Sequence, residues 1–245
     1  MSVTTCRGCR RVVYAAHVNP DGYCCFCEAV APPAPQTPAP AYEIRWQEFT
    51  TLLAPDVKGW FHHADLMLAM LTAEQPLLAV ELGSYRGASA IPQARTLAEW
   101  GGRLVCVDPW RDFPGSYEQI QQNVARYGLT NVDLWRMRSV EAAHRWPEAE
   151  VERPAWIYVD GDHSDAGVQA DLEAWWPLLA EGGLILGDDY GNPDYPGVAR
   201  AWHRFGADKD LHTERGRHTW GLVWIRKGPS PAAETVHTEL AQAAA

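Results

Sequence analysis

An α/β fold with a doubly wound, mostly parallel sheet is predicted for residues 43–228 of this 245-residue chain. Five short apolar runs of strand length recur along this part, and longer stretches with helical spacing lie between them. Strands that alternate with helices build a parallel sheet that is covered on both faces. A late run of β-type residues, HTWGLVWIR at 218–226, adds a C-terminal antiparallel strand to the prediction.

The predicted elements follow one another in a regular order. Ahead of the first strand, EIRWQEFTTLL and GWFHHADLMLAMLTAE predict two helices, in which Trp46 and Trp60 are interpreted as packing anchors, as is Trp100 further along the chain. The adjacent His62 and His63 receive no functional role. SYEQIQQNVARYG, between the second and third strands, has apolar residues at three- and four-residue intervals and predicts another helix. The five runs are LLAVEL (77–82), RLVCVD (103–108), VDLWRM (132–137), AWIYVD (155–160) and GLILGD (183–188).

The N-terminal segment predicts a small zinc-ribbon-like module at 1–30. CRGC and CCFC give two C-x₂-C pairs with fourteen residues between them, a spacing typical of structural Zn²⁺ sites. His17 is an alternative ligand, and a reduced, disordered tail is the alternative to a metal site. Five prolines predict an extended Pro/Ala linker at 31–42, and the Ala-rich residues 229–245 predict a flexible tail. The four expected zinc ligands are Cys6, Cys9, Cys24 and Cys27.

Charge and composition narrow the classes of partner. The formal net charge of -10 disfavours nucleic-acid binding. No window has the roughly 18 apolar residues of a membrane span, and the polar start has no signal-peptide core. We therefore expect a cytoplasmic protein without a membrane partner. The isolated Cys106 is interpreted as a core residue, and a homo-oligomer or a protein partner for the N-terminal module is left open.

The residues after each strand indicate a ligand site, because ligands of open α/β sheets bind at the carboxyl ends of the strands. The first run leads into VELGSYRGAS, with Glu81 at the strand end and Gly83 and Gly87 four residues apart. Glycines allow a tight turn and a close approach to a ligand. Asp108 ends the second run, where a carboxylate can accept hydrogen bonds from a ribose. The G-x-G-x-x-G fingerprint is absent, which disfavours nicotinamide cofactors.

VELGSYRGASA followed by VCVDPW resembles the nucleotide half of the class I methyltransferases that use S-adenosylmethionine, a Rossmann-like family. With VDGDHS and GGLILGDDY, the resemblance extends to small-molecule O-methyltransferases of the catechol and macrocin type, over residues 45–227. It implies a ribose contact at Asp108 and places Ser139 near the adenine. The cofactor loop that it implies comprises Glu81, Gly83, Ser84, Tyr85, Gly87 and Ser89.

Acidic residues end the fourth and fifth runs and predict a metal site. Asp160 follows the fourth run, and Asp188 and Asp189 follow the fifth. Three carboxylates at one edge of the sheet repel one another unless a cation lies among them, and their hard oxygens suit Mg²⁺ or another divalent cation. Related O-methyltransferases bind a metal at these positions, commonly with Asn in place of Asp189 and a lysine base in place of His163.

His163 is the expected general base, because the pKa of an ordinary histidine lies near neutrality. The alternative is that it caps the next helix or pairs with an acid. Asp162 and Asp165 fit turn and cap positions instead. The function expected is methyl transfer to a hydroxyl of a sugar, polyketide or phenolic compound, with Asp160 and His163 at the reacting centre. The alternatives are a zinc-ribbon adaptor with a modifying or inactive methyltransferase fold, and another reaction, such as hydroxylation, on the same fold.

Overall fold

The computed structural model describes residues 3–5, 12–14, 51–149, 152–215 and 221–228. Two short strands near the N-terminus, β1 (Val3–Thr5) and β2 (Val12–Tyr14), pair in antiparallel fashion. The four predicted zinc-ligand cysteines, His17, Trp46, the Pro/Ala linker and the C-terminal tail lie outside the described residues. The zinc site and these domain boundaries stay predictions.

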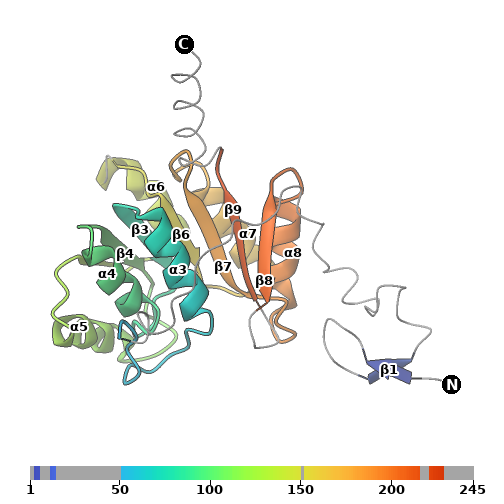
Figure 1. Cartoon of the computed structure of the whole chain (residues 1–245), viewed down its shortest axis with the longest axis horizontal. Coiled ribbons are helices and arrows are strands. Elements are labelled where there is room, and N and C mark those ends of the chain that lie inside the picture. The colour runs from blue at the N-terminus through green and yellow to red at the C-terminus, as the bar shows by residue number, and fades with distance from the viewer. Residues whose placement is uncertain (1–2, 6–11, 15–50, 150–151, 216–220, 229–245) are drawn as a thin grey trace, which may run out of the picture.

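A seven-stranded sheet forms the centre of the fold, in the order β5-β4-β3-β6-β7-β9-β8 (Figure 1). All five predicted strand runs are strands, and the predicted C-terminal strand β9 pairs antiparallel with β7. The structure adds β8, which the sequence did not predict because LHTER has no apolar run. The strands are β3 (Leu78–Leu82), β4 (Arg103–Val107), β5 (Val132–Trp135), β6 (Trp156–Val159), β7 (Leu184–Tyr190), β8 (Leu211–Arg215) and β9 (Gly221–Arg226).

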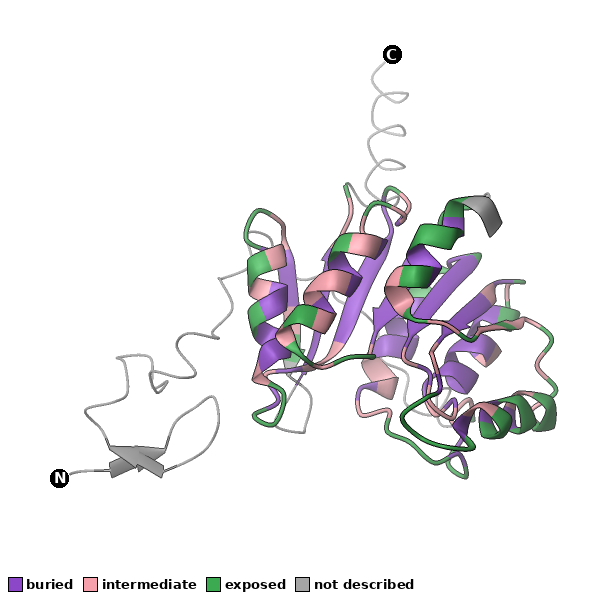
Figure 2. Cartoon of the chain, turned by 180° about the vertical axis from the view of Figure 1, so that it is seen from behind, coloured by how far each residue is buried: buried purple, intermediate pink, exposed green. Residues whose placement is uncertain are grey.

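Helices cover both faces of this sheet. The longer helices are α3 (Ala64–Glu74), α4 (Ala90–Ala98), α5 (Ser116–Arg126), α6 (Ser139–Ala149), α7 (Asp165–Trp175) and α8 (Pro196–Phe205). Successive strand residues point to opposite faces, so Val80 packs with α6, α7 and α8, whereas Ala79 packs with α3 and α4. Figure 2 shows α6, α7 and α8 with buried residues toward the sheet and exposed residues outward. The mostly parallel, doubly wound sheet is confirmed.

Strand register brings the ends of the central strands to one edge. Leu82 pairs with Val107 of β4 and with Val159 of β6, and Val159 pairs with Gly187 of β7. The residues that follow these strands are therefore neighbours, although up to 105 positions separate them along the chain, from Gly83 to Asp188. Because the chain winds from β3 to β4 and β5 and then crosses to β6, this edge is also the switch point of the sheet, where α/β folds bind ligands.

Two expectations for the segment before β3 need correction. The predicted helix over 43–53 does not include residues 51 and 52, which form a turn; residues 43–50 lie outside the described part of the chain. Trp60 is no packing anchor, since 74% of it is exposed, whereas Trp100 donates its indole N–H to the carbonyl of Pro76 and packs against the core. No helix in the described ranges is long and apolar enough to cross a bilayer.

Candidate functional site

The loop between β3 and α4 passes against the end of β6. Gly83 has a φ of +91°, and a Cβ atom there would lie 2.2 Å from the carbonyl oxygen of Asp160. Gly87, with a φ of +92°, closes the next turn by donating its N–H to the carbonyl of Ser84. At Gly83, only glycine combines a positive φ with so close an approach. The two predicted glycines thus shape the loop, although Gly87 itself does not line the cavity described below.

Glu81 lies beneath this loop and is fully buried. Its Oε1 accepts hydrogen bonds from Ser89 Oγ at 2.6 Å and from Gln93 Nε2 at 2.8 Å. Burial raises the pKa of Glu81 to about 7, although these hydrogen bonds oppose the shift. Glu81 does not line the cavity. Through its hydrogen bond with Ser89, it supports the start of α4 and holds Ser89 at the cavity wall.

Asp108 connects the glycine loop to the loop that follows β4. Its Oδ2 accepts the backbone N–H of Tyr85 at 2.9 Å, and its Oδ1 accepts that of Trp110 at 2.6 Å. Both partners have a φ near +46°, and Trp110 Nε1 donates back to the carbonyl of Tyr85 at 2.6 Å. Burial raises the pKa of Asp108, while the two amides favour the ionised form. Each carboxylate oxygen keeps a further lone pair for a ligand.

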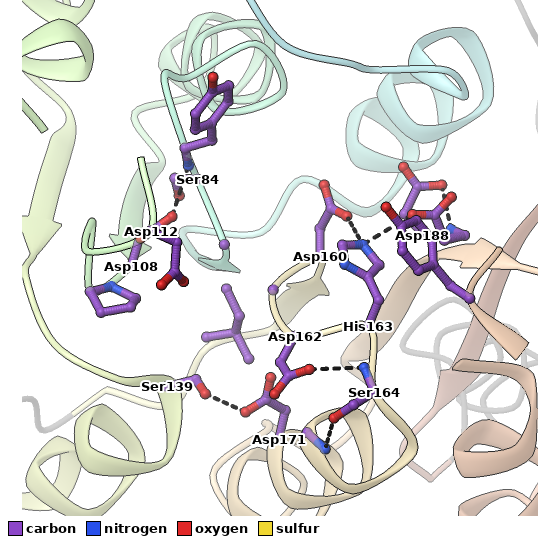
Figure 3. Close-up of a pocket in the computed structure, with 18 of the residues that line it drawn as sticks. Ser84, Asp108, Asp112, Ser139, Asp160, Asp162, His163, Ser164, Asp171 and Asp188 are labelled. Carbon is purple, nitrogen blue, oxygen red and sulfur yellow. Dashed lines mark hydrogen bonds and ion pairs between the residues drawn. The ribbon is translucent and has the colours of Figure 1, made fainter. Parts of the chain in front are cut away.

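Ser139 begins α6 and is hydrogen-bonded through its hydroxyl to the carboxylate of Asp171 on α7 (Figure 3). Asp171 is 3% exposed, and burial raises its pKa to about 6. Both residues line the cavity. Asp171 is not predicted from the sequence, because a single acid in the middle of a helix matches no motif.

An acid–histidine cluster, formed by Asp160, His163 and Asp189, lies at the ends of β6 and β7. His163 Nε2 lies 3.4 Å from Asp160 Oδ1 and 3.0 Å from Asp189 Oδ2. The imidazole stacks on the ring of Tyr195, with centroids 4.5 Å apart and an interplanar angle of 25°. Asn192 Nδ2 donates to Asp189 Oδ1 at 2.7 Å and fixes that carboxylate from its other side.

The proton balance of this cluster follows from burial and charge. Burial by itself lowers the pKa of His163, but its close contacts with the carboxylates of Asp160 and Asp189 and their negative charges raise it to about 10. Burial raises the pKa of Asp160 to about 8 despite its contact with His163. Burial also acts to raise the pKa of Asp189, yet the ion pair with His163 and the hydrogen bond from Asn192 bring it below the ordinary value. Asp189 is therefore the ionised acid of the cluster.

Asp188, the third predicted metal ligand, lies beside the cluster, but its carboxylate faces Tyr158 and His63 instead of His163. Its Oδ2 accepts from the Tyr158 hydroxyl at 2.9 Å, and its Oδ1 lies 3.8 Å from Nε2 of the buried His63. Adjacent strand residues point to opposite faces. A register shift of β7 against β9 between Gly187 and Tyr190, with a φ of +55° at Asp189, sets the direction of the two carboxylates.

The cluster has the donor chemistry of a divalent-cation site. One oxygen from each of two carboxylates and one imidazole nitrogen lie within 4.8 Å of one another. Carboxylates suit Mg²⁺ and Mn²⁺, and an added imidazole also suits Fe²⁺ and Zn²⁺. The remaining acids of this loop serve its local structure. Asp162 accepts the backbone N–H of Ser164 at 2.8 Å, and Asp165 is held by Arg200 and Arg204.

These groups surround one cavity of about 1340 Å³. Figure 3 shows Ser84, Asp108 and Ser139 on one side of it and Asp160, His163 and Asp188 on the other. A pocket for one drug-sized ligand measures about 300–1,000 Å³, so this cavity has room for two molecules. Lining residues without a predicted role include His62, Asp112, Arg138, Asp171, Asn192 and Asp194. The sequence analysis assigns no role to His62 and His63, because side chains of adjacent helical residues diverge, but in the structure both residues precede α3.

Comparison with known proteins identifies the fold. Residues 80–190 match the family described as a methyltransferase domain. No curated protein matches the chain significantly.

Among solved structures, the O-methyltransferase TomG from Streptomyces achromogenes, involved in tomaymycin synthesis and bound to SAM, is 18% identical with a TM-score of 0.56, over 75% of this chain and 86% of that chain. An O-methyltransferase from Bacillus cereus in complex with SAH is 17% identical with a TM-score of 0.54, over 77% and 84%. The SAH-bound methyltransferase PaMTH1 from Podospora anserina is also 17% identical with a TM-score of 0.54, over 75% and 86%. The chain thus has the fold of class I, S-adenosylmethionine-dependent O-methyltransferases.

Proposed function

We propose that the chain transfers the methyl group of S-adenosylmethionine to a hydroxyl of a small molecule such as a sugar, a polyketide or a phenolic compound. The observation that carries this proposal is the position of the acid–histidine cluster, which lines the same cavity as the glycine loop and Asp108. The methyltransferase domain match and the SAM- and SAH-bound structures of the same fold support the choice of cofactor.

In this proposal, one half of the cavity holds the cofactor. The backbone of Gly83, Ser84 and Tyr85 faces the methionine part, and Asp108 accepts the ribose hydroxyls through its remaining lone pairs. Ser139, held by Asp171, lies beside the adenine. The loop is held in shape by Glu81 and Gly87, which lie behind the cavity surface, and by Ser89, which lies at its edge.

The other half binds the acceptor and manages its proton. Asp160 and Asp189 would hold a divalent cation, with Asp188 beside them and His163 left free of the ion, and such an ion would act as a Lewis acid that lowers the pKa of a hydroxyl. His163 is the proposed base. Since a base must be neutral, His163 can take a proton only when another cation balances the charges of Asp160 and Asp189. The transfer is an in-line displacement, so alignment of oxygen, methyl and sulfur is the main demand on the protein.

The test combines cofactor binding with a screen for methylated products. Calorimetry should show binding of S-adenosylmethionine, and mass spectrometry should show the gain of one methyl group on some hydroxylated compound in the presence of Mg²⁺ or Mn²⁺. Asp189→Ala and EDTA should each abolish turnover, whereas Asp208→Ala, at an exposed site paired with Lys209, should keep it. Absence of cofactor binding contradicts the proposal, and full turnover with EDTA contradicts the metal.

A further inference from the structure

The cavity has a strong excess of negative charge. Nine aspartates and three arginines line it, and no lysine or glutamate does, which leaves six formal negative charges. A divalent cation and the single net positive charge of S-adenosylmethionine would offset three of them. The charge that remains favours a cation as the second ligand.

Exposed aromatic residues form the rim of the same cavity. The described residues include four large hydrophobic side chains that are exposed, and Trp60, Phe113 and Tyr195 of these line the cavity. Phe113 packs on Tyr85 in the cofactor half. Tyr195 lies in the acceptor half, where it stacks on His163 and remains 43% exposed, whereas Trp60 follows Gly59, which adjoins Tyr85 and Ala88 on the cofactor side. Open aromatic faces bind flat rings and cations.

The loop after β7 fixes an additional acid next to this rim. Asn192 is 6% exposed, and its two amide atoms join Asp189 to the loop, since Nδ2 donates to Asp189 and Oδ1 accepts the N–H of Asp194 at 3.0 Å. Asp194 is exposed and precedes Tyr195. A carboxylate and an aromatic face therefore lie together at the cavity mouth, beside the acid–histidine cluster.

We infer that the acceptor is a hydroxylated ring compound with a protonated amine, whose ring packs on Tyr195 and whose ammonium group is bound near Asp194. This inference rests on the proposed function, because it concerns the acceptor of the same site. Compounds with a carboxylate or phosphate near the reacting hydroxyl are repelled by the charge that remains after the cofactor binds.

The experiment uses two series in which only the charge changes. Dopamine, N-acetyldopamine and 3,4-dihydroxyphenylacetate share a catechol ring, and glucosamine, N-acetylglucosamine and glucuronate share a sugar ring. Dissociation constants are measured with SAH bound, and kcat/KM is measured with S-adenosylmethionine. We expect the cationic member of at least one series to bind about tenfold more tightly than the neutral one, and the anionic member to bind most weakly.

Asp194→Asn should reduce the preference for the cationic over the neutral member at least threefold, and the matched control Asp208→Asn, outside the cavity, should not. Equal or reversed order in both series, or no binding in either, overturns the inference. Methyl transfer without a charge preference refutes the inference and keeps the proposed function. A charge preference in binding without any methyl transfer supports a cationic ligand for this half of the cavity and contradicts the proposed function, and with it the ligand's role as acceptor.

Discussion

The two halves of the cavity are built in different ways. In the cofactor half, the contacts that shape the site involve the backbone: Gly83 has no room for a Cβ atom, and both oxygens of Asp108 accept hydrogen bonds from backbone amides. In the acceptor half, side chains hold one another: His163 lies between Asp160 and Asp189. A backbone site is rigid and depends on conformations that few residues adopt, whereas a site of paired side chains can be altered without changing the fold.

Gly83→Ala is expected to have the largest effect, because Gly83 is where the two halves meet. Its added Cβ would overlap the carbonyl oxygen of Asp160, so the loop and the end of β6 must separate. We expect a loss of about 3–5 kcal/mol of stability and a decrease in cofactor affinity of at least about 100-fold. Chemical unfolding and calorimetry measure both.

Gly101→Ala is the matched control, since Gly101 also has a positive φ, +80°, but nothing lies within 4 Å of its Cβ position. It should show only the backbone strain, about 1–2 kcal/mol, with unchanged cofactor binding. Equal cofactor affinity in the two variants would show that the contact between the halves has no effect on the loop.

Glu81→Gln tests the buried support of the cofactor half. The pKa of Glu81 is about 7 in the folded chain and about 4.5 when unfolded, so the folded state binds the extra proton between these values. Stability from this group is therefore lost as pH rises from about 4.5 to 7, by up to about 3 kcal/mol. The variant lacks this loss, so its stability relative to the wild type should rise between pH 5 and pH 8.

Urea unfolding of both proteins at the two pH values gives this difference, in which the shared contributions of Asp171 and other acids cancel. Glu99→Gln, at an exposed position at the end of α4, is the control and should show no such change. A flat difference for Glu81→Gln would mean that Glu81 is ionised in the folded chain throughout this range.

The sequence allowed much of the cofactor half to be predicted, because its signals are local. Glycines four apart after an apolar strand, and an acid at the end of the next strand, predicted the loop and Asp108 from short stretches. Parallel register then placed Gly83, Asp108, Asp160 and Asp188 at one edge of the sheet. The parallel arrangement predicted by the apolar runs thus indicated which residues lie at this edge, whereas the order of the strands comes from the structure.

Orientation within the acceptor half could not be predicted in the same way. The irregular register of β7 determines that Asp189 meets His163 while Asp188 faces Tyr158, and a bulge has no sequence signature here. Asn192 and Tyr195 come close to the cluster only through the path of their loop. The sequence therefore indicated which strands supply acids, but not which acids share a ligand.

Asp108→Asn tests whether backbone contacts set cofactor affinity. Asparagine offers one acceptor oxygen and a donor NH₂, so one of the amides of Tyr85 and Trp110 would face another donor. We expect about thirtyfold weaker binding of S-adenosylmethionine, equivalent to about 2 kcal/mol, with little change in Mn²⁺ binding. Asp133→Asn, on the exposed side of β5, serves as control. Loss of Mn²⁺ affinity in Asp108→Asn would mean that the two halves are not independent.

Asp189→Asn and Asp188→Asn form the last pair, with the smallest expected effects, and they separate the two adjacent acids of β7. Asn at 189 keeps an oxygen donor but removes the ionised charge beside His163, so Mn²⁺ affinity should fall about tenfold. Asn at 188 changes a group engaged by Tyr158 and His63, outside the cluster, and should lower the Mn²⁺ affinity less than Asn at 189 does. Titration of Mn²⁺ by electron paramagnetic resonance, in the absence of cofactor, measures both. A larger loss in Asp188→Asn would show that the carboxylate of Asp188 turns to the metal when it binds, and that the three-acid site predicted from the sequence forms only around the ion.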